Sequence, residues 1–231
     1  DYHDAIKKMG SEVESIFQKA AQEVINDQID CDIDIVTDGE VRRENYIHYH
    51  CRYLEGIDFN KLTKKVARTG NYECWLPTVI GKINAKESFL IHDWEVAQKI
   101  SSKPVKITIP GPMTITDTIS NEYYSSPKEM GKDFAKAINV EIKRLAAAGC
   151  KYIQVDEPLF ARKPMEALDY GIANLEKCFY EIQDTKVEKI THICCGYPDK
   201  LDVKDYPKAP LESYHQIAKQ LDESIIDTVS I

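Results

Sequence analysis

Apolar residues recur along this chain with two spacings, one typical of amphipathic helices and one of buried strands. From Ser11 onward the spacing is helical and predicts a helix of about four turns, with Ser11 and Glu14 as a capping pair at its start. The apolar positions of that helix are Val13, Ile16, Phe17, Ala20, Ala21, Val24 and Ile25. Directly after it, the segment Ile33–Thr37 predicts a short buried strand that ends at polar residues.

The same succession of helix and strand returns after residue 104. The predicted strands are Val105–Ile109, Tyr152–Val155, Lys189–Cys194 and Asp227–Ile231. The predicted helices cover residues 93–100, 126–149, 165–182 and 211–222, and the second of them has Ser126 and Pro127 at its start and Gly149 at its end. Residues 46–59 are rich in aromatic side chains, and Trp75–Gly81 is expected to be extended.

Strands that alternate with helices, and polar residues that follow the strands, indicate parallel βα units. The simplest fold of this kind is a (β/α)8 TIM barrel, an α/β fold with eight strands and typically ~250 residues. Because 231 residues with five or six strands are too few, we expect residues 1–231 to form a single barrel domain that is incomplete at both ends. A doubly wound open sheet is the structural alternative, although no Gly-x-Gly-x-x-Gly loop follows a predicted strand.

The composition is that of a globular chain with one sizeable core, since 43% of the residues are hydrophobic and the formal net charge is -8. The excess of 38 acidic over 30 basic residues argues against nucleic acid and against an anionic membrane as partners, and leaves small molecules as the expected substrates. No apolar run approaches the roughly 20 residues that span a bilayer, and the first residues lack the features of a signal peptide. Seven scattered cysteines favour a reducing cytoplasm. The oligomeric state is left open.

His192 and Cys194 stand two residues apart in a predicted strand. Because side chains alternate between the two faces of a strand, the imidazole and the thiol are expected on the same face, where both could bind one metal ion. Zinc with nitrogen and sulfur ligands and an open position could then hold a substrate thiol as thiolate. For such a pair taken alone, a place in the core is the commoner role. Cys195 is expected on the opposite face, as a small buried side chain.

Two acidic residues follow predicted strands. Glu40 comes after the first strand, within the segment Asp38–Arg43, and Asp156 ends another. In a barrel of parallel strands both would lie on the rim that also carries the His/Cys pair, and together they would suit an ammonium group. A solvated turn with a salt bridge is the alternative for Glu40.

Four short motifs occur in a characteristic order along the chain. They are Asp38–Arg43, Gly111–Thr114, Ile153–Pro158 and Thr191–Cys194. With these motifs the chain resembles the catalytic domain of cobalamin-independent methionine synthase over roughly residues 30–231. The resemblance implies a (β/α)8 barrel in which a zinc ion activates homocysteine for methyl transfer.

The resemblance also implies roles for four residues. His192 and Cys194 correspond to zinc ligands of the family, and Glu40 and Asp156 correspond to the acids that hold the amino group of homocysteine or methionine. The family's other two zinc ligands, a glutamate and a cysteine, and its proton-donating histidine are expected beyond Ile231. Zinc is the cofactor that the resemblance implies.

The methyl donor is defined less well by these motifs. In folate-using members a tryptophan that stacks on the pterin follows the Gly-Pro-x-Thr motif, whereas Thr118 stands near that place here. The resemblance implies 5-methyltetrahydrofolate or a related carrier, and Trp75 is a hypothetical alternative stacking surface. Two further functions stay open: a related barrel methyltransferase with a corrinoid or other donor or another thiol acceptor, and a non-catalytic barrel subunit that binds zinc or an amino acid.

Overall fold

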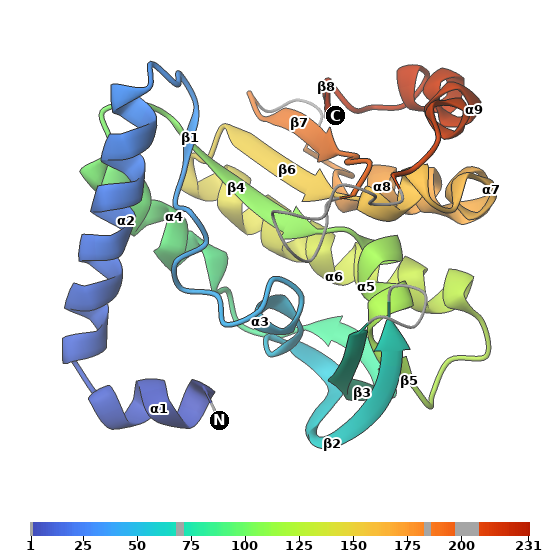
Figure 1. Ribbon diagram of the computed structural model, residues 1–231, viewed down its shortest axis with the longest axis horizontal. Coiled ribbons are helices and arrows are strands. Elements are labelled where there is room, and N and C mark those ends of the chain that lie inside the picture. The colour runs from blue at the N-terminus through green and yellow to red at the C-terminus, as the bar shows by residue number, and fades with distance from the viewer. Residues whose placement is uncertain (1, 68–71, 183–185, 197–207) are drawn as a thin grey trace.

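The computed structural model describes residues 2–67, 72–182, 186–196 and 208–231, which form two sheets and the helices around them (Figure 1). The larger sheet has five parallel strands in the order β1-β4-β6-β7-β8. Their bounds are β1 Val36–Thr37, β4 Val105–Pro110, β6 Tyr152–Asp156, β7 Glu188–His192 and β8 Thr228–Ser230. The smaller sheet, in the order β2-β3-β5, consists of β2 Leu54–Ala67, β3 Tyr72–Ala85 and β5 Ser120–Asn121.

Most helices of the described residues alternate with the strands of the larger sheet, as the sequence predicts, whereas those at residues 2–9, 48–51 and 112–118 were not predicted. The helices are α1 Tyr2–Met9, α2 Glu12–Asp30, α3 His48–Cys51, α4 Leu90–Ile100, α5 Pro112–Thr118, α6 Pro127–Ala148, α7 Pro164–Glu166, α8 Ile172–Cys178 and α9 Leu211–Asp222. Two short segments of other helix types, η2 Pro158–Ala161 and η3 Ala167–Gly171, flank α7.

The order of the parallel strands follows their order in the chain. Each new strand is therefore added on the same side of the last, as in the wall of a (β/α)8 barrel, whereas a doubly wound sheet reverses direction at a switch point. Figure 1 shows strands β1, β4, β6 and β7 side by side, with the β2–β3 hairpin lying apart from them. Among the described residues the five strands form an arc of barrel wall, and the arc is not closed.

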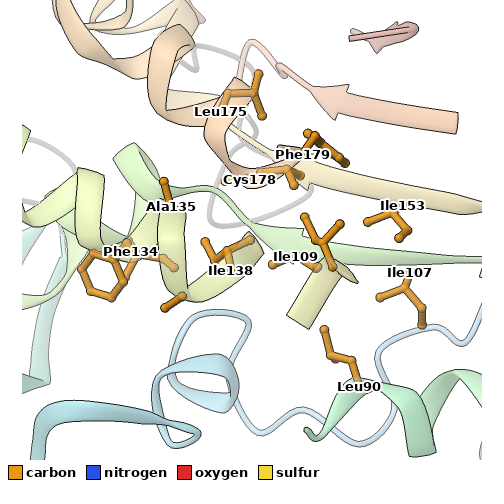
Figure 2. Close-up of a cluster of buried hydrophobic side chains, with 14 of the residues drawn as sticks. Leu90, Ile107, Ile109, Phe134, Ala135, Ile138, Ile153, Leu175, Cys178 and Phe179 are labelled. Atoms are coloured by element: carbon orange, nitrogen blue, oxygen red, sulfur yellow. The ribbon is translucent and has the colours of Figure 1, made fainter. Parts of the chain in front are cut away.

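One face of the parallel sheet is apolar and packs against helices (Figure 2). The buried side chains that meet there are Ile107 and Ile109 of β4, Ile153 of β6, Leu90 of α4, Phe134, Ala135 and Ile138 of α6, and Leu175 and Cys178 of α8 with Phe179 just after it. Each large side chain buried in this way contributes up to ~1.5–3 kcal/mol to the gross free energy of folding.

The other face of the same strands is polar. Lys106 and Thr108 alternate with the buried isoleucines of β4, and Gln154 and Asp156 alternate with the buried Ile153 and Val155 of β6. Because successive side chains of a strand point to opposite faces, these polar residues face away from the helices, toward the interior of the barrel. This alternation positions the candidate site.

The start and end signals of α6 are confirmed. Ser126 Oγ accepts a hydrogen bond from the amide of Glu129, and Gly149 adopts the left-handed conformation with φ 103° just after the last turn. The capping pair expected at Ser11 and Glu14 is wrong, because the Ser11 side chain makes no cap hydrogen bond.

Glu14 is held elsewhere. Its carboxylate forms a bidentate ion pair with Arg42 at 2.8 and 2.7 Å. Arg42 Nε also lies 3.6 Å from Asp93 Oδ1, so one guanidinium joins α2 to α4. A bidentate ion pair with a buried arginine stabilises a carboxylate more than an exposed cap hydrogen bond does. Glu14 therefore pairs with Arg42 instead of capping the helix.

Some boundaries differ from those predicted. The strand expected at Ile33–Thr37 is reduced to Val36–Thr37, because Asp32 has a positive φ of 59° and Ile33 is exposed. The helix expected at 165–182 includes the five-residue π-helical segment η3 and ends at Cys178. Trp75–Gly81 is extended, as expected, within β3, but the sequence did not predict its long partner strand β2.

Candidate active site

Four residues from four neighbouring strands form one row at the carboxyl end of the parallel sheet. Pro110 of β4 pairs in register with Asp156 of β6, Asp156 pairs with His192 of β7, and His192 pairs with Ser230 of β8. The ends of parallel barrel strands carry the active sites of this fold class. The row therefore brings the predicted amino-group acid and the predicted metal ligand to adjacent strands.

Asp156 is buried and has a hydrogen-bond donor on each oxygen. Gln154 Nε2 donates to its Oδ1 at 2.7 Å, and the Tyr46 hydroxyl donates to its Oδ2 at 3.1 Å. Burial raises the pKa of Asp156 to about 6, the two hydrogen bonds act to lower it, and the charge of Glu40 raises it further. Each carboxylate oxygen still has a lone pair for a further donor.

Glu40 is anchored through one oxygen only. Its Oε1 accepts hydrogen bonds from Arg43 Nη1 at 2.8 Å and from Thr108 Oγ1 at 2.6 Å. Arg43 Nη2 also donates to the backbone oxygen of Thr108 at 2.9 Å, and its side chain is almost fully buried. Among the described residues nothing is hydrogen-bonded to Glu40 Oε2, and the side chain is 34% exposed.

A tight turn brings Glu40 to this position. Glu40 has a positive φ of 55°, and its amide donates to Asp38 Oδ1 at 3.0 Å. Such a turn, in which an aspartate accepts from the backbone two residues on, is a common use of Asp before glycine. The turn follows the end of β1 and places the Glu40 carboxylate beside Thr108 of β4.

Glu40 and Asp156 are electrostatically coupled. The charge of Glu40 contributes to the raised pKa of Asp156, and both carboxylates contribute, after burial, to the raised pKa of Tyr46. Two carboxylates close together repel, and a cation between them relieves that repulsion. The structure thus brings together the two acids that the sequence singled out and leaves oxygen lone pairs for a positively charged group.

His192 ends β7, and its ring has one anchored nitrogen. His192 Nδ1 is hydrogen-bonded to Ser230 Oγ at 3.1 Å. Burial and then the charge of Lys106 lower the pKa of His192, which favours the neutral ring, the form that binds a metal. A hydrogen bond on one ring nitrogen fixes the orientation in which the other nitrogen meets a metal ion.

Cys194 lies just past the strand. Ile193 is fully buried between the half-buried His192 and Cys194, so the alternation of faces continues beyond the end of β7. The Ile193 amide also donates to the backbone oxygen of Ser230 at 2.8 Å, which extends the ladder by one bond. The expected burial of Cys195 is wrong, because this side chain is half-buried in a non-strand segment.

An imidazole whose Nε2 has no hydrogen-bond partner among the described residues, and a half-buried thiol two residues on, fit a zinc ion in donor type and spacing. In the part of the chain that the structure describes, no group of three or more His, Cys, Asp or Glu side chains is arranged to hold a metal. The two residues would supply half of a zinc ligand set, and their role as ligands stays a prediction.

Glu157, to which the sequence analysis assigned no role, lies beside Gly111 and is hydrogen-bonded to the start of α5. The fully buried Glu157 carboxylate accepts from the amides of Met113 and Thr114 at 2.9 and 3.0 Å and from the Thr114 hydroxyl at 2.7 Å. Burial raises the pKa of Glu157 to about 8, against the effect of these hydrogen bonds. Glu157 thereby fixes the start of α5, where the Gly-Pro-x-Thr motif lies, directly beside Asp156.

Sequence reasoning also missed Tyr46 and Lys106, and it named Arg43 only as part of the motif Asp38–Arg43, whose alternative interpretation, a turn with a salt bridge, includes the ion pair seen between Arg43 and Glu40. Lys106 donates to Gln154 Oε1 at 2.7 Å, and burial lowers its pKa while the charge of Asp156 raises it. A signal for Lys106 was present, because it is a polar residue at an alternate position of an apolar strand. Tyr46 carries no such signal, since its partner Asp156 is 110 residues away in the sequence.

Comparison with known proteins identifies the family. Residues 3–195 match the family described as cobalamin-independent synthase, catalytic domain. The chain belongs to the cobalamin-independent methionine synthase family. A methionine synthase of Sulfolobus acidocaldarius is 32% identical over 241 residues, covering 97% of this chain and 69% of the relative. A methionine synthase of Saccharolobus solfataricus is 35% identical over 196 residues, covering 84% of this chain and 57% of the relative.

A solved structure gives the same result. The B12-independent methionine synthase from Shewanella sp. W3-18-1, determined in complex with selenomethionine, superposes with a TM-score of 0.83 at 33% identity. The match covers 96% of this chain and 64% of that chain. The expected (β/α)8 class is confirmed by this likeness together with the sequential strand order.

The four motifs of this methionine synthase-type chain occupy the positions expected of them. Asp38–Arg43 follows β1, Gly111–Thr114 begins α5, Asp156 ends β6, and His192 ends β7. Across the residues that the structure describes, no helix has the length and apolar character needed to cross a membrane.

Proposed function

We propose that this chain is part of a zinc-dependent methyltransferase that makes methionine by transferring a methyl group to the thiol of homocysteine. The observation that carries the proposal is the register pairing of Asp156 with His192 across β6 and β7. It sets an acidic, ammonium-binding position one strand away from a nitrogen and sulfur donor pair. Homocysteine has an ammonium group and a thiol joined by a short chain, so one molecule can reach both.

The amino group of homocysteine is held between Glu40 and Asp156. Glu40 Oε2, which has no hydrogen-bond partner among the described residues, and the remaining lone pairs of Asp156 accept its N–H bonds. The repulsion between these carboxylates is relieved when the ammonium enters. Held at this end, the amino acid directs its thiol along the rim toward His192, and such positioning supplies a large part of the rate of a bimolecular transfer.

His192 and Cys194 hold the zinc ion, together with the glutamate and cysteine that the family resemblance implies. When bound, zinc lowers the pKa of a coordinated thiol and makes the nucleophilic thiolate dominant at neutral pH. Ser230 holds the ring of His192 in position through Nδ1. The selenomethionine bound to the related Shewanella enzyme supports an amino-acid subsite of this kind.

The methyl donor that we propose is 5-methyltetrahydrofolate or a related carrier. Trp75 lies on β3 with 60% of its surface exposed, so a planar ligand can stack on it. If Trp75 contributes to donor binding, Trp75→Ala raises the KM for methyltetrahydrofolate and leaves that for homocysteine unchanged. A corrinoid donor is the alternative, and assays with methylcobalamin in place of methyltetrahydrofolate separate the two.

The zinc assignment is tested by replacing Cys194 in the whole protein and measuring zinc content and turnover. Cys194→Ala is expected to lose bound zinc and methyl transfer together. Cys195→Ala is the matched control, because it removes a half-buried thiol one residue away and is expected to retain both. A Cys194→Ala protein that is free of zinc and fully active overturns the assignment.

The second function that stays open is a non-catalytic barrel subunit. It is supported instead if the wild-type protein binds zinc and homocysteine but transfers methyl from no donor. We further propose that residues 1–231 belong to one barrel domain and that the protein works in the cytoplasm.

A further inference from the structure

A chain of hydrogen bonds runs from β4 to the acid of the proposed amino-acid subsite. Lys106 Nζ donates to Gln154 Oε1 at 2.7 Å, and Gln154 Nε2 donates to Asp156 Oδ1 at 2.7 Å. Gln154 and Asp156 are 7% and 8% exposed, so their side chains exchange few hydrogen bonds with water. Lys106 is half-buried on the neighbouring strand.

Lys106 sets the donor-to-acceptor direction of this series of hydrogen bonds. A glutamine amide has an oxygen that only accepts and a nitrogen that only donates, and rotation by half a turn exchanges them. A lysine ammonium only donates, so it binds the oxygen end of the amide. With the oxygen of Gln154 held by Lys106, the amide nitrogen faces Asp156.

The opposite orientation of the Gln154 amide would disfavour the charged form of Asp156. It would place the amide oxygen against a carboxylate oxygen, where two acceptors face each other unless Asp156 takes up a proton. A protonated Asp156 loses its charge and with it the attraction for an ammonium group. The orientation of the Gln154 amide therefore decides whether Asp156 is suited to bind the amino group of a substrate.

We propose that Lys106 is a positioning residue of the amino-acid subsite, which orients the Gln154 amide so that Asp156 is held as a carboxylate open to the substrate ammonium. The inference rests on the proposed function for the identity of that substrate. It adds a residue from β4 to the subsite and assigns it a role without contact with the substrate. Tyr46, on the other oxygen of Asp156, supports the same state from the opposite side.

The test measures the binding of L-methionine to the zinc-loaded whole protein by calorimetry, with kcat and KM for homocysteine as a second readout. Lys106→Met is expected to weaken methionine binding about tenfold or more, the scale of one hydrogen bond to a charged group. The KM for homocysteine rises in parallel, whereas kcat and zinc content stay at wild-type values. Lys106→Arg, which also only donates, is expected to restore tight binding. Lys106→Gln, which accepts as well as donates, is likewise expected to weaken the binding of L-methionine. It replaces Lys106→Met in the experiment if Lys106→Met does not fold.

A double-mutant cycle separates orientation from the mere presence of a positive charge. In a Gln154→Met background there is no amide to orient, so adding Lys106→Met is expected to cost little further affinity. An equal loss in both backgrounds would show that the lysine acts through its charge alone and would overturn the inference. The ligand 4-(methylthio)butanoate, which is methionine without its amino group, is expected to bind wild type and Lys106→Met equally.

Failure of the inference and failure of the proposed function give different results. If wild type binds methionine and Lys106→Met binds it equally well, the inference alone is overturned. If Lys106→Met loses zinc, the lysine acts on the metal ligands and the inference is again overturned. If zinc-loaded wild type binds neither methionine nor homocysteine, the proposed function falls and the inference with it.

Discussion

Gly111 lies so close to Glu157 that a side chain at position 111 has no room: a Cβ built there falls 2.2 Å from Glu157 Cδ. The carboxylate cannot move aside cheaply, because three hydrogen bonds hold it at the start of α5. Gly111 has a φ of −75°, so this glycine is required for space and not for its backbone conformation. The close approach links the Gly-Pro-x-Thr motif to the residue directly after Asp156.

Gly111→Ala is therefore expected to destabilise the protein by about 1–3 kcal/mol, the usual cost of overpacking a core. Denaturant unfolding measures the loss. In a Glu157→Ala background the same substitution is expected to cost clearly less, because the clashing atoms are gone. Gly81→Ala is the matched control, since its Cβ would meet only ordinary van der Waals contact at 3.6 Å. An unchanged unfolding midpoint in Gly111→Ala would contradict the packing described here.

Glu40→Gln is expected to raise the KM for homocysteine about tenfold to a hundredfold, the scale of a hydrogen bond to a charged group. The amide keeps an oxygen for Arg43 and Thr108 but has no charge to attract the substrate ammonium. Zinc content should not change. Steady-state kinetics with metal analysis checks this, and Glu95→Gln on the exposed side of α4 is the control. A loss of zinc with an unaltered KM would move Glu40 from the amino-acid subsite to the metal.

Ser230→Ala is expected to weaken zinc binding about tenfold to a hundredfold, as does the loss of other groups that orient a metal-binding histidine. Ser230 Oγ holds His192 Nδ1, and alanine leaves the ring free to turn. Competition with a chelator measures the affinity. Thr228→Val removes a hydroxyl from the same strand that is bonded to Glu188, and its zinc affinity should match wild type. Equal affinities in the two variants would argue against His192 as a ligand held by Ser230.

The pH dependence of stability should contain a contribution from Asp93. Burial raises its pKa from 3.8 to about 6, against the effects of Tyr49 and Arg42. The folded state therefore binds this proton more tightly than the unfolded state, so the stabilisation is present below pH 4 and is lost as the pH rises through about 6. The shift corresponds to a change on the order of 3 kcal/mol at most.

Asp93→Asn is expected to remove that contribution, so its free energy of unfolding falls less than that of wild type between pH 4 and pH 7. Urea unfolding at several pH values measures the difference between the two curves. Asp34→Asn, whose side chain is 88% exposed, should give a curve parallel to wild type. Parallel curves for wild type and Asp93→Asn would mean that Asp93 is ionised alike in the folded and unfolded states.

The parts of the fold that the sequence predicts well are those with local signals. β4 and β6 show apolar side chains at alternate positions, and α6 has a serine cap and a terminal glycine that act within a few residues. The β2–β3 hairpin lacks such a signal. Its register shifts between Glu55 and Ile57 and again between Asp58 and Leu62, and each shift breaks the two-residue period by which a strand is detected.

The candidate site divides in the same way. Asp156 and His192 could be placed together in advance because the carboxyl ends of parallel strands meet at one edge. Lys106, Gln154 and Tyr46 could not be ranked, because their importance lies in which partner each one finds. Nothing near Tyr46 in the sequence indicates that its hydroxyl reaches Asp156. The order of the motifs in the sequence predicts which residues lie at the carboxyl ends of the strands. The hydrogen-bond partners of those residues are seen only in the structure.

The single row from Pro110 to Ser230 has a consequence for how the protein becomes functional. If β7 slipped by one residue against β6, His192 would exchange places with its neighbours and turn toward the aliphatic layer beneath α6 and α8. A misaligned intermediate would thus lack both a sound core and a metal-binding face. Correct alignment of these strands creates the core and the proposed metal-binding face together, so zinc binding at His192, if it occurs as we propose, would report that the barrel wall has assembled in its native register.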